Sequence, residues 1–241
     1  DLQHEYYPQF FTQAELDGRA RTYEPSVDKA TQVIVPSQYT RQTLAEKYGT
    51  SDDKMTLVPV RLADSFSRAS QAEITRIKVK YSLPDGLIFY PANPWPHKNH
   101  ARLMAALRIC KQRYGQVLPL VLSGRLHGEK RNAMEMAIAA GVEAQVIDLG
   151  FVALQDLPAI YSAATMLVFP SLFEGFGIPL VEAMACGCPI AAADATSIPE
   201  VTNGAALLFD PVDPEAIAAA IHRVWTDAAL REHLVQKGYV Q

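Results

Sequence analysis

The sequence has few cysteines, no long apolar run and no recognisable metal-binding pattern. No stretch approaches the ~18 consecutive apolar residues of a membrane-spanning helix, and none resembles the apolar core of a signal peptide. Three cysteines in 241 residues indicate a reducing compartment rather than a disulfide framework. Cys186 and Cys188 have no further ligand at zinc spacing, and no Asp-x-Asp occurs, so we predict no metal and no other cofactor.

The charge balance argues against a nucleic-acid-binding protein. Lysine and arginine number 22 against 26 aspartates and glutamates, which gives a net charge of −4. A local basic pocket for one phosphorylated ligand is compatible with that balance. Hydrophobic residues make up 49% of the chain and charged residues 20%, so the sequence can bury a sizeable core and is not disordered.

From about Gly86 onward, short apolar runs alternate with amphipathic segments. The runs are continuously apolar, which predicts strands that are covered on both faces. The expected strands are 87–90, 118–122, 146–149, 166–169, 189–193 and 206–209, and the expected helices are 99–114, 129–140, 157–164 (with Asp156 as its N-cap), 179–186, 214–225 and 228–237. This order predicts an α/β fold with a doubly wound parallel, Rossmann-like sheet.

The first 65 residues or so follow a different plan. They predict a charged helix over 13–28, a strand at 32–36, a helix over 38–48 with Ser37 as its N-cap, and a strand at 55–60. Two strands and two helices cannot bury their own faces as an independent sheet. We therefore expect residues 1–66 to be the remnant of an incomplete second α/β domain with its linker, and residues 67–241 to be a complete domain. The chain also opens without an initiator methionine, which suggests a piece of a longer polypeptide.

The strongest local signal is the segment 171–182, which follows a predicted buried strand and enters a helix. Gly175 and Gly177 let a backbone approach a ligand closely, and the free N–H groups at the helix start suit a phosphate. Glu174 and Glu182 beside such an anion site would face hydroxyl groups, one of a sugar and the other of a ribose. The alternative is an ordinary strand-to-helix turn with both glutamates solvated.

A second candidate site follows the first strand of the larger unit, at residues 91–100. Three prolines rigidify this loop, and Lys98 at its end could offset the charge of a diphosphate; the alternative is a rigid surface loop with a solvated lysine. Arg125 is a weaker phosphate candidate, for which a surface arginine is the alternative. The backbone of Phe151 and Val152 could line a base pocket, unless Phe151 is a core aromatic.

These residues resemble the retaining GT-B glycosyltransferases of family 4, also called glycosyl transferases group 1. The Glu-x7-Glu pattern of that family matches Glu174 to Glu182, and the segments 182–189, 199–201 and 207–211 look like the family's as well. Near the N-terminus, the segments 1–4, 7–11 and 35–40 resemble the end of the family's acceptor domain. The resemblance implies a GT-B fold, in which residues 67–241 are the C-terminal domain that binds the nucleotide sugar.

The resemblance also implies roles for individual residues. Lys98 would bind the donor diphosphate, Glu182 the ribose, and Glu174 with the 175–178 backbone the transferred sugar and its phosphates. Lys98 and Glu174 are thus the expected catalytic residues, and the expected donor-binding residues are Asn93, Arg125, Phe151, Val152, Gly175, Phe176, Gly177, Ile178 and Glu182. Asn93 stands near the place where the family usually has an arginine. The charge of the donor phosphates must then be offset by Lys98, by the start of the helix and by Arg125, or binding is weaker.

We therefore expect a glycosyltransferase that moves a hexosyl group from a nucleoside-diphosphate sugar to a glycan or lipid-linked acceptor. The acceptor hydroxyl would attack the face that the diphosphate leaves, with retention of configuration. The expected location is the cytoplasm, including the inner face of a bacterial membrane. By the resemblance, the active-site histidine would lie just before Asp1 and the crossing helix beyond the C-terminus. We expect this chain alone to be inactive and to need a chain or segment that supplies the rest of the N-terminal domain.

Two other functions remain open on the sequence. The chain could be a non-catalytic module that binds a nucleotide sugar, since the acceptor half is incomplete. It could also be a sugar-nucleotide epimerase or a phosphorylase, because both use the GT-B architecture. Phosphate-dependent product formation, or release of nucleoside diphosphate without an acceptor, would favour the latter.

Overall fold

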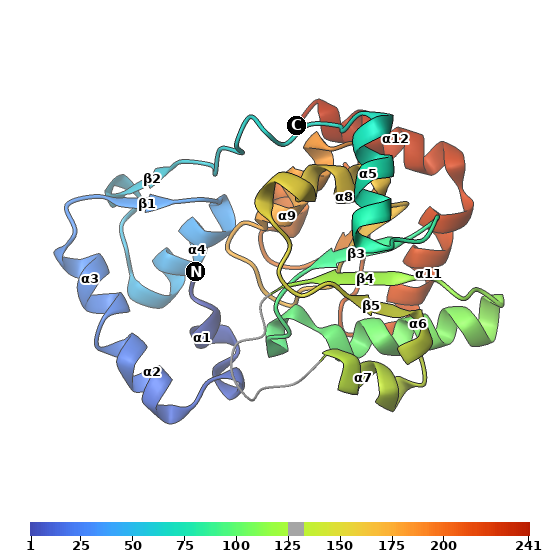
Figure 1. The fold of residues 1–241 in the computed structure, drawn as a ribbon. Coiled ribbons are helices and arrows are strands. Elements are labelled where there is room, and N and C mark those ends of the chain that lie inside the picture. Colours follow the sequence, from blue (N-terminus) through green and yellow to red (C-terminus); the bar gives the residue numbers. More distant parts are fainter. Residues whose placement is uncertain (125–132) are drawn as a thin grey trace.

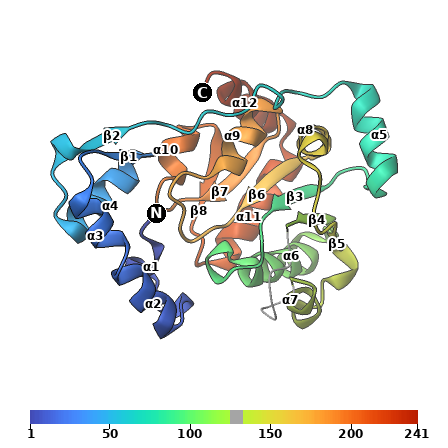
Figure 2. The same ribbon diagram turned by 60° about the vertical axis from the view of Figure 1, so that its left-hand side comes forward.

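The structure, a computed structural model, describes residues 1–124 and 133–241, and it contains two α/β units (Figure 1). The smaller unit has a parallel pair of strands, and the larger unit has a six-stranded sheet. Figure 2 shows the smaller unit beside the end of the sheet formed by β6, β7 and β8. Among the described helices, none combines the length and the apolar character needed to cross a membrane.

The smaller unit folds around a small apolar cluster. Its elements are α1 (Gln3–Tyr6), α2 (Gln13–Ala20), α3 (Tyr23–Lys29), β1 (Val33–Val35), α4 (Gln38–Tyr48) and β2 (Met55–Leu57). Its core consists of Leu2, Val35, Leu44 and Met55. Ser37 caps α4 as predicted, since its Oγ accepts a hydrogen bond from the N–H of Thr40 at 3.0 Å.

One predicted helix of this unit is wrong. The segment 13–28, expected as a single helix, forms α2 and α3 with a break at Arg21 and Thr22. Pro25 explains the break, because a proline ring collides with the carbonyl four residues earlier, here that of Arg21. Pro25 is instead accommodated in the first turn of α3, where its missing N–H costs no hydrogen bond.

The larger unit confirms the predicted doubly wound parallel sheet. Its strands are β3 (Ile88–Pro91), β4 (Leu120–Ser123), β5 (Val146–Asp148), β6 (Met166–Phe169), β7 (Ile190–Ala193) and β8 (Ala206–Phe209). All pair in parallel in the order β5-β4-β3-β6-β7-β8. Strands β4, β6 and β7 are buried along their whole length, as expected for a sheet covered on both faces.

Helices cover both faces of this sheet. They are α5 (Gln71–Tyr81), α6 (His100–Tyr114), α7 (Ala133–Ala140), α8 (Leu157–Ala163), α9 (Ile178–Ala185), α10 (Ile198–Thr202), α11 (Pro214–Thr226) and α12 (Ala228–Tyr239). Helix α6 packs against α7 and α11 on one face, whereas α9 packs against α8 and α12 on the other (Figure 1). Residues 129–132 of the expected 129–140 helix lie outside the described residues.

Sequence reasoning missed α5 and α10 and misjudged one cap. Helix α5 opens with a capping box, in which Ser70 and Glu73 bond each other's backbone, a pattern readable in the sequence. Asp156 stands at the N-cap position of α8 as predicted, but its side chain makes no capping hydrogen bond. It reaches α5 instead, where Lys80 and Tyr81 donate to its Oδ2.

Candidate functional site

Strands β3 and β6 are neighbours in the sheet although two strands separate them in the sequence. The chain runs from β3 to β4 and β5 on one side, and then returns to build β6, β7 and β8 on the other side. The strand order therefore reverses between β3 and β6. In open α/β sheets, the loops at the carboxyl ends of two such strands separate and leave a crevice that binds ligands.

The loop after β3 is fixed by hydrogen bonds to neighbouring strands and loops. The hydroxyl of Tyr90, at the end of β3, donates to the carbonyl of Lys98 at 2.7 Å. The side-chain amide of Asn99 donates to the carbonyls of Pro170 and Pro211 at 3.0 and 2.8 Å. Asn99 adopts a left-handed conformation with φ +61°, which turns the chain into α6. Lys98 is thereby held between the two halves of the sheet.

Lys98 and Glu174 meet beyond the carboxyl ends of β3 and β6. The Nζ of Lys98 donates to Oε1 of Glu174 over 2.6 Å. Their side chains are only 17% and 12% exposed, so the pair is partly shielded from water. The structure thus brings together the two predicted catalytic residues, and the alternatives of a solvated lysine and a solvated Glu174 are wrong.

The loop after β6 is held in place by residues that follow β7. The N–H of Glu174 donates to Oγ1 of Thr196 at 3.1 Å. The buried Oγ of Ser197 lies within hydrogen-bond distance of the carbonyls of Glu174 and Phe176, at 3.0 and 3.1 Å. These contacts fix the backbone on both sides of Gly175. The position of the Glu174 carboxylate is therefore set before any ligand binds.

The two glycines of this loop have different reasons to be glycine. Gly177 has φ +99°, a conformation that residues with a Cβ rarely adopt, and it directly precedes α9. A Cβ on Gly175 would lie 2.8 Å from the Cβ of Asp1, so the space is occupied by the N-terminal segment. We expected Gly175 to make room for a ligand, and the structure shows that it makes room for Asp1.

The carbonyl of Gly175 ties this loop to the smaller unit. It accepts hydrogen bonds from Oγ of Ser37 at 2.7 Å and from Oγ1 of Thr40 at 3.0 Å. Helix α9 follows this loop and begins at Ile178. Among the described residues, no side chain caps its first turn. Such a helix start carries free N–H groups and a partial positive charge, which together favour an anion.

Glu182 lies one turn into α9 and is partly buried. The hydroxyl of Tyr161, on α8, donates to its Oε2 at 2.6 Å. Burial raises the pKa of Glu182 above its ordinary value, and the hydrogen bond from Tyr161 opposes that effect. The alternative of a solvated glutamate is wrong here too. The sequence analysis missed Tyr161. The spacing of apolar residues predicts the helix that carries Tyr161, but it does not indicate which polar side chain the hydroxyl contacts.

The other predicted donor-binding residues are scattered around the crevice. Phe151 follows β5 and is 66% exposed, so the alternative of a core aromatic is wrong, whereas the side chain of Val152 belongs to the core. The Oδ1 of Asn93 lies against Gly124, since a Cβ there would come within 2.8 Å of it. Ile178 is 46% exposed at the start of α9. Arg125 lies outside the described residues.

The buried histidines of the loop after β3 are neutral at physiological pH. Burial, with Lys98 and His100 adding to it, lowers the pKa of His97 to about 3. Burial likewise lowers the pKa of His100 to about 4. Neither side chain adds a positive charge to the crevice, so Lys98 supplies the cation there.

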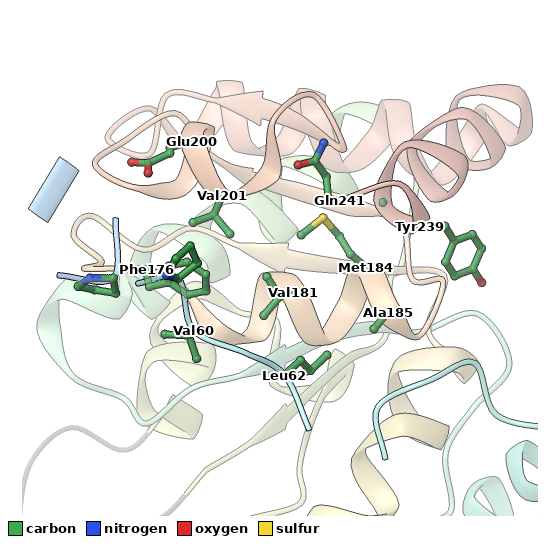
Figure 3. A pocket seen from close by; sticks show the side chains of 13 residues that line it. Val60, Leu62, Phe176, Val181, Met184, Ala185, Glu200, Val201, Tyr239 and Gln241 are labelled. Carbon is green, nitrogen blue, oxygen red and sulfur yellow. The ribbon is translucent and has the colours of Figure 1, made fainter. Parts of the chain in front are cut away.

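A large cavity lies away from Lys98, Glu174 and Glu182. It measures about 480 Å³ and is lined by the linker at Val60 and Leu62, by Phe176, and by one side of α9 (Figure 3). Lys98, Glu174 and Glu182 do not line it. Within the described residues, no group of three His, Cys, Asp or Glu side chains is placed to hold a metal ion, and the three cysteines are free and buried.

Comparison with known proteins identifies the relatives of this chain. The sequence profile of the family "Glycosyl transferases group 1" matches residues 73–241. O-antigen chain mannosyltransferase B from Escherichia coli is 29% identical over 97% of this chain and 62% of its own length. Serotype-specific mannosyltransferase WbdA from Escherichia coli is 31% identical over 86% of this chain and 26% of its own. The chain thus spans less than two thirds of these curated relatives.

The fold of this chain also matches the fold of solved structures. The crystal structure of Anabaena HepE in complex with UDP and glucose aligns with a TM-score of 0.80 at 22% identity, over 97% of this chain and 63% of that one. At this identity the likeness establishes the fold alone, which is the GT-B arrangement that the sequence predicted.

Proposed function

Because this chain belongs to the glycosyl transferases group 1 family, we propose that it is the donor-binding portion of a retaining glycosyltransferase. The whole enzyme would move a hexosyl group from a nucleoside-diphosphate sugar to a glycan or lipid-linked acceptor. The observation that carries this proposal is the contact between Lys98 and Glu174 beside the uncapped start of α9, at the point where the strand order reverses. The names of the relatives make mannose the first sugar to test.

The proposed division of labour follows the two units. Residues 67–241 would bind the nucleotide sugar, and residues 1–66 would form part of the acceptor domain. The remainder of that domain would come from a further segment or a separate chain, in keeping with the greater length of the relatives. One of those relatives is named an O-antigen chain mannosyltransferase, and we propose that the reaction takes place at the inner face of a bacterial membrane.

The proposed chemistry depends on charge that develops as the diphosphate leaves. The bond between the anomeric carbon and the diphosphate breaks while the acceptor hydroxyl attacks the same face, and negative charge builds up on the phosphate oxygens. Lys98 and the N–H groups at the start of α9 would stabilise that charge, which is usually the largest single contribution to catalysis. Glu174 would hold a hydroxyl of the transferred sugar, and Glu182 the ribose. We propose no covalent intermediate with a carboxylate, and no metal ion or other cofactor.

The test of this proposal combines binding with turnover. Calorimetry of this chain with UDP, GDP and dTDP would identify the base, and we expect one of them to bind. In the whole enzyme, Lys98→Ala should raise the activation free energy by about 2–4 kcal/mol and lower turnover accordingly. Lys111→Ala is the matched control, because Lys111 is an exposed lysine near the end of α6, the helix that follows Lys98. Wild-type turnover in the Lys98 variant would contradict the assignment.

Assays of transfer distinguish the remaining functions. We expect no transfer by this chain alone and transfer once the missing N-terminal part is supplied. Nucleotide binding without transfer in the completed protein would indicate a non-catalytic module. Release of nucleoside diphosphate without an acceptor, or a requirement for inorganic phosphate, would indicate an epimerase or a phosphorylase instead.

A further inference from the structure

A second cavity, of about 300 Å³, lies between the N-terminal segment and the loop that precedes Lys98. Two kinds of side chain line it. Aromatic rings come from Phe10, Phe11 and Trp95, and polar groups come from Gln3, Glu15 and Arg19. Its volume is at the lower end of the range for small-molecule sites, and its walls come from both units.

This cavity adjoins the crevice that holds Lys98 and Glu174. His97, which lines the cavity, directly precedes Lys98, and its carbonyl accepts a hydrogen bond from the N–H of Leu172 at 2.8 Å. On the other wall, the ring of Phe10 stacks on Tyr7 with centroids 5.1 Å apart. Tyr7 in turn packs edge-on against Phe173, the neighbour of Glu174 in the sequence. The cavity is therefore connected to the proposed donor site through His97 on one wall and through Phe10, Tyr7 and Phe173 on the other.

The aromatic walls suit the apolar face of a sugar ring. The side chain of Trp95 is 52% exposed, which is a large exposed indole at the edge of a cavity. The face of an aromatic ring carries negative charge density, and the C–H groups on one side of a pyranose ring are weakly positive, so the two surfaces attract each other. Phe10 and Phe11 add further apolar surface to the lining of the cavity.

The polar groups suit hydroxyls rather than phosphates. Arg19 lies over the ring of Phe11 at 4.5 Å and donates to the hydroxyl of Tyr23 at 3.2 Å, so its guanidinium is held in place. A guanidinium has five N–H donors, of which the bond to Tyr23 uses one. The carboxylate of Glu15 adds a negative charge to the same wall, which would repel a phosphate, and its Oε2 already accepts hydrogen bonds from the N–H and the hydroxyl of Thr12 at 2.7 and 2.8 Å. His97 stays neutral because burial lowers its pKa to about 3.

We propose that this cavity binds the terminal sugar ring of the acceptor, with the Trp95 indole against the C–H face of the ring and Arg19 on its hydroxyls. The inference rests on the proposed function, because an acceptor subsite has a role only beside a donor sugar. It assigns part of acceptor recognition to Trp95, a residue of the donor-binding unit. A glycan that ends in an uncharged hexose is the class of acceptor that fits these walls.

Tryptophan fluorescence gives a local test. The chain has two tryptophans, Trp95 and Trp225, so a Trp225→Phe background leaves Trp95 as the single reporter. Methyl α-glycosides of mannose, glucose, galactose and rhamnose are the probes. We expect at least one of them to cause a saturable shift of Trp95 emission to shorter wavelength, with a Kd on the order of 1 mM, as is typical of so small a ligand.

Two variants in the same background locate the effect. Phe11→Ala and Arg19→Met should each weaken the response about fivefold or more, by loss of apolar surface and of hydrogen-bond donors. Arg21→Met is the matched control, because Arg21 is exposed two residues further along and does not line the cavity. An equal loss in the Arg21 variant would contradict the assignment to this cavity.

Nucleotide binding, measured by calorimetry on the same proteins, separates this inference from the proposed function. We expect it to be unchanged in Arg19→Met. If nucleotide binds but no glycoside perturbs Trp95, the inference is wrong and the proposed function stands. If no nucleotide binds, the proposed function fails first. A response to a short polyprenol and to none of the glycosides would also overturn the inference, since it would assign the cavity to a lipid.

Discussion

Glu174 neutralises Lys98 in the ligand-free protein, with 2.6 Å between Oε1 and Nζ. The two residues are 76 positions apart in the sequence and meet because their strands, β3 and β6, are neighbours. A diphosphate that binds to Lys98 must compete with the carboxylate for the same ammonium group. With the proposed roles, the ion pair would oppose binding of a bare nucleotide, and a sugar bound at Glu174 would relieve that competition.

The first prediction follows from this competition. Glu174→Gln removes the negative charge but keeps a side chain of the same shape, so Lys98 becomes more available to phosphate. We expect nucleoside diphosphate to bind about fivefold more tightly, which corresponds to about 1 kcal/mol for a partly buried pair. Turnover in the whole enzyme should fall at the same time, because the hydroxyl of the transferred sugar loses its charged acceptor.

Calorimetry with the nucleotide and a transfer assay together check this prediction. Glu143→Gln serves as the control, because Glu143 is an exposed glutamate in the turn before β5. Unchanged nucleotide affinity in the Glu174 variant would mean that the ion pair does not compete with the ligand. Unchanged turnover would remove Glu174 from the proposed set of catalytic residues.

The architecture of the larger unit was predictable because each of its elements carries a local pattern. The apolar run at β6 and the glycine after α6, Gly115 with φ +66°, are readable without knowledge of the rest of the fold. Helix α5 was missed although Ser70 and Glu73 form a capping box. Its sequence is largely polar, so it lacks the apolar pattern from which the other helices were predicted. The split of the 13–28 helix was also readable from Pro25.

The candidate site was predictable only as separate pieces. The sequence indicated Lys98, Glu174 and Glu182, because glycines, prolines and charges there occur in unusual combinations. It could not show that Tyr161 donates to Glu182, or that Asp1 occupies the space beside Gly175, because both contacts depend on packing between distant segments. The roles of the predicted donor-binding residues stay predictions until a nucleotide is bound.

The second prediction concerns pH and Glu182. Burial raises the pKa of this carboxyl above its ordinary value of about 4.5, so between that pH and the raised pKa the folded state binds more protons than the unfolded state. The free energy of unfolding therefore falls as the pH rises through this window. Glu182→Gln abolishes this contribution. The free energy of unfolding of the variant, relative to that of wild type, should therefore rise as the pH increases from 4 to 7. Urea unfolding across that range measures it, and parallel profiles would contradict the prediction.

The same substitution tests the proposed ribose contact. Loss of the charged acceptor should weaken nucleoside diphosphate binding roughly tenfold, or about 1.5 kcal/mol. The comparison with a 2′-deoxynucleotide is the control, because a ligand that lacks one ribose hydroxyl has less to lose. Equal effects on the two nucleotides would show that Glu182 does not bind the 2′-hydroxyl.

The third prediction concerns Asp156, which joins α8 to α5. Its side chain is buried, and Lys80, Tyr81 and Arg76 donate to it at 2.5, 2.8 and 3.3 Å. Burial alone raises the pKa of Asp156, but these hydrogen bonds outweigh it and hold the pKa below the ordinary 3.8. The stabilisation is therefore present above pH 3.8 and is lost as the pH falls through the lowered pKa.

Asp156→Asn should accordingly destabilise the protein by roughly 1–2 kcal/mol at pH 7, a value reduced by the partial exposure of Lys80 and Arg76. Urea unfolding at pH 7 and pH 3 measures the difference, which should narrow at the lower pH. Asp148→Asn, at the exposed last residue of β5, is the control. A constant difference at the two pH values would assign the loss to packing rather than to charge.

The fourth prediction concerns the contact between the two units at Glu200. The carboxylate of Glu200, on α10, accepts hydrogen bonds from the N–H groups of Gln38 and Tyr39 at 2.7 and 3.0 Å, which places a negative charge at the start of α4. Glu200→Ala removes both acceptors and should weaken the first turn of α4 by about 0.5–1 kcal/mol. Amide hydrogen exchange would then quicken about two- to fivefold at the start of α4 and stay unchanged in α6, which packs against the far side of the sheet. Equal exchange in wild type and variant would mean that Ser37 and Thr40, through the carbonyl of Gly175, hold the two units together without help from Glu200.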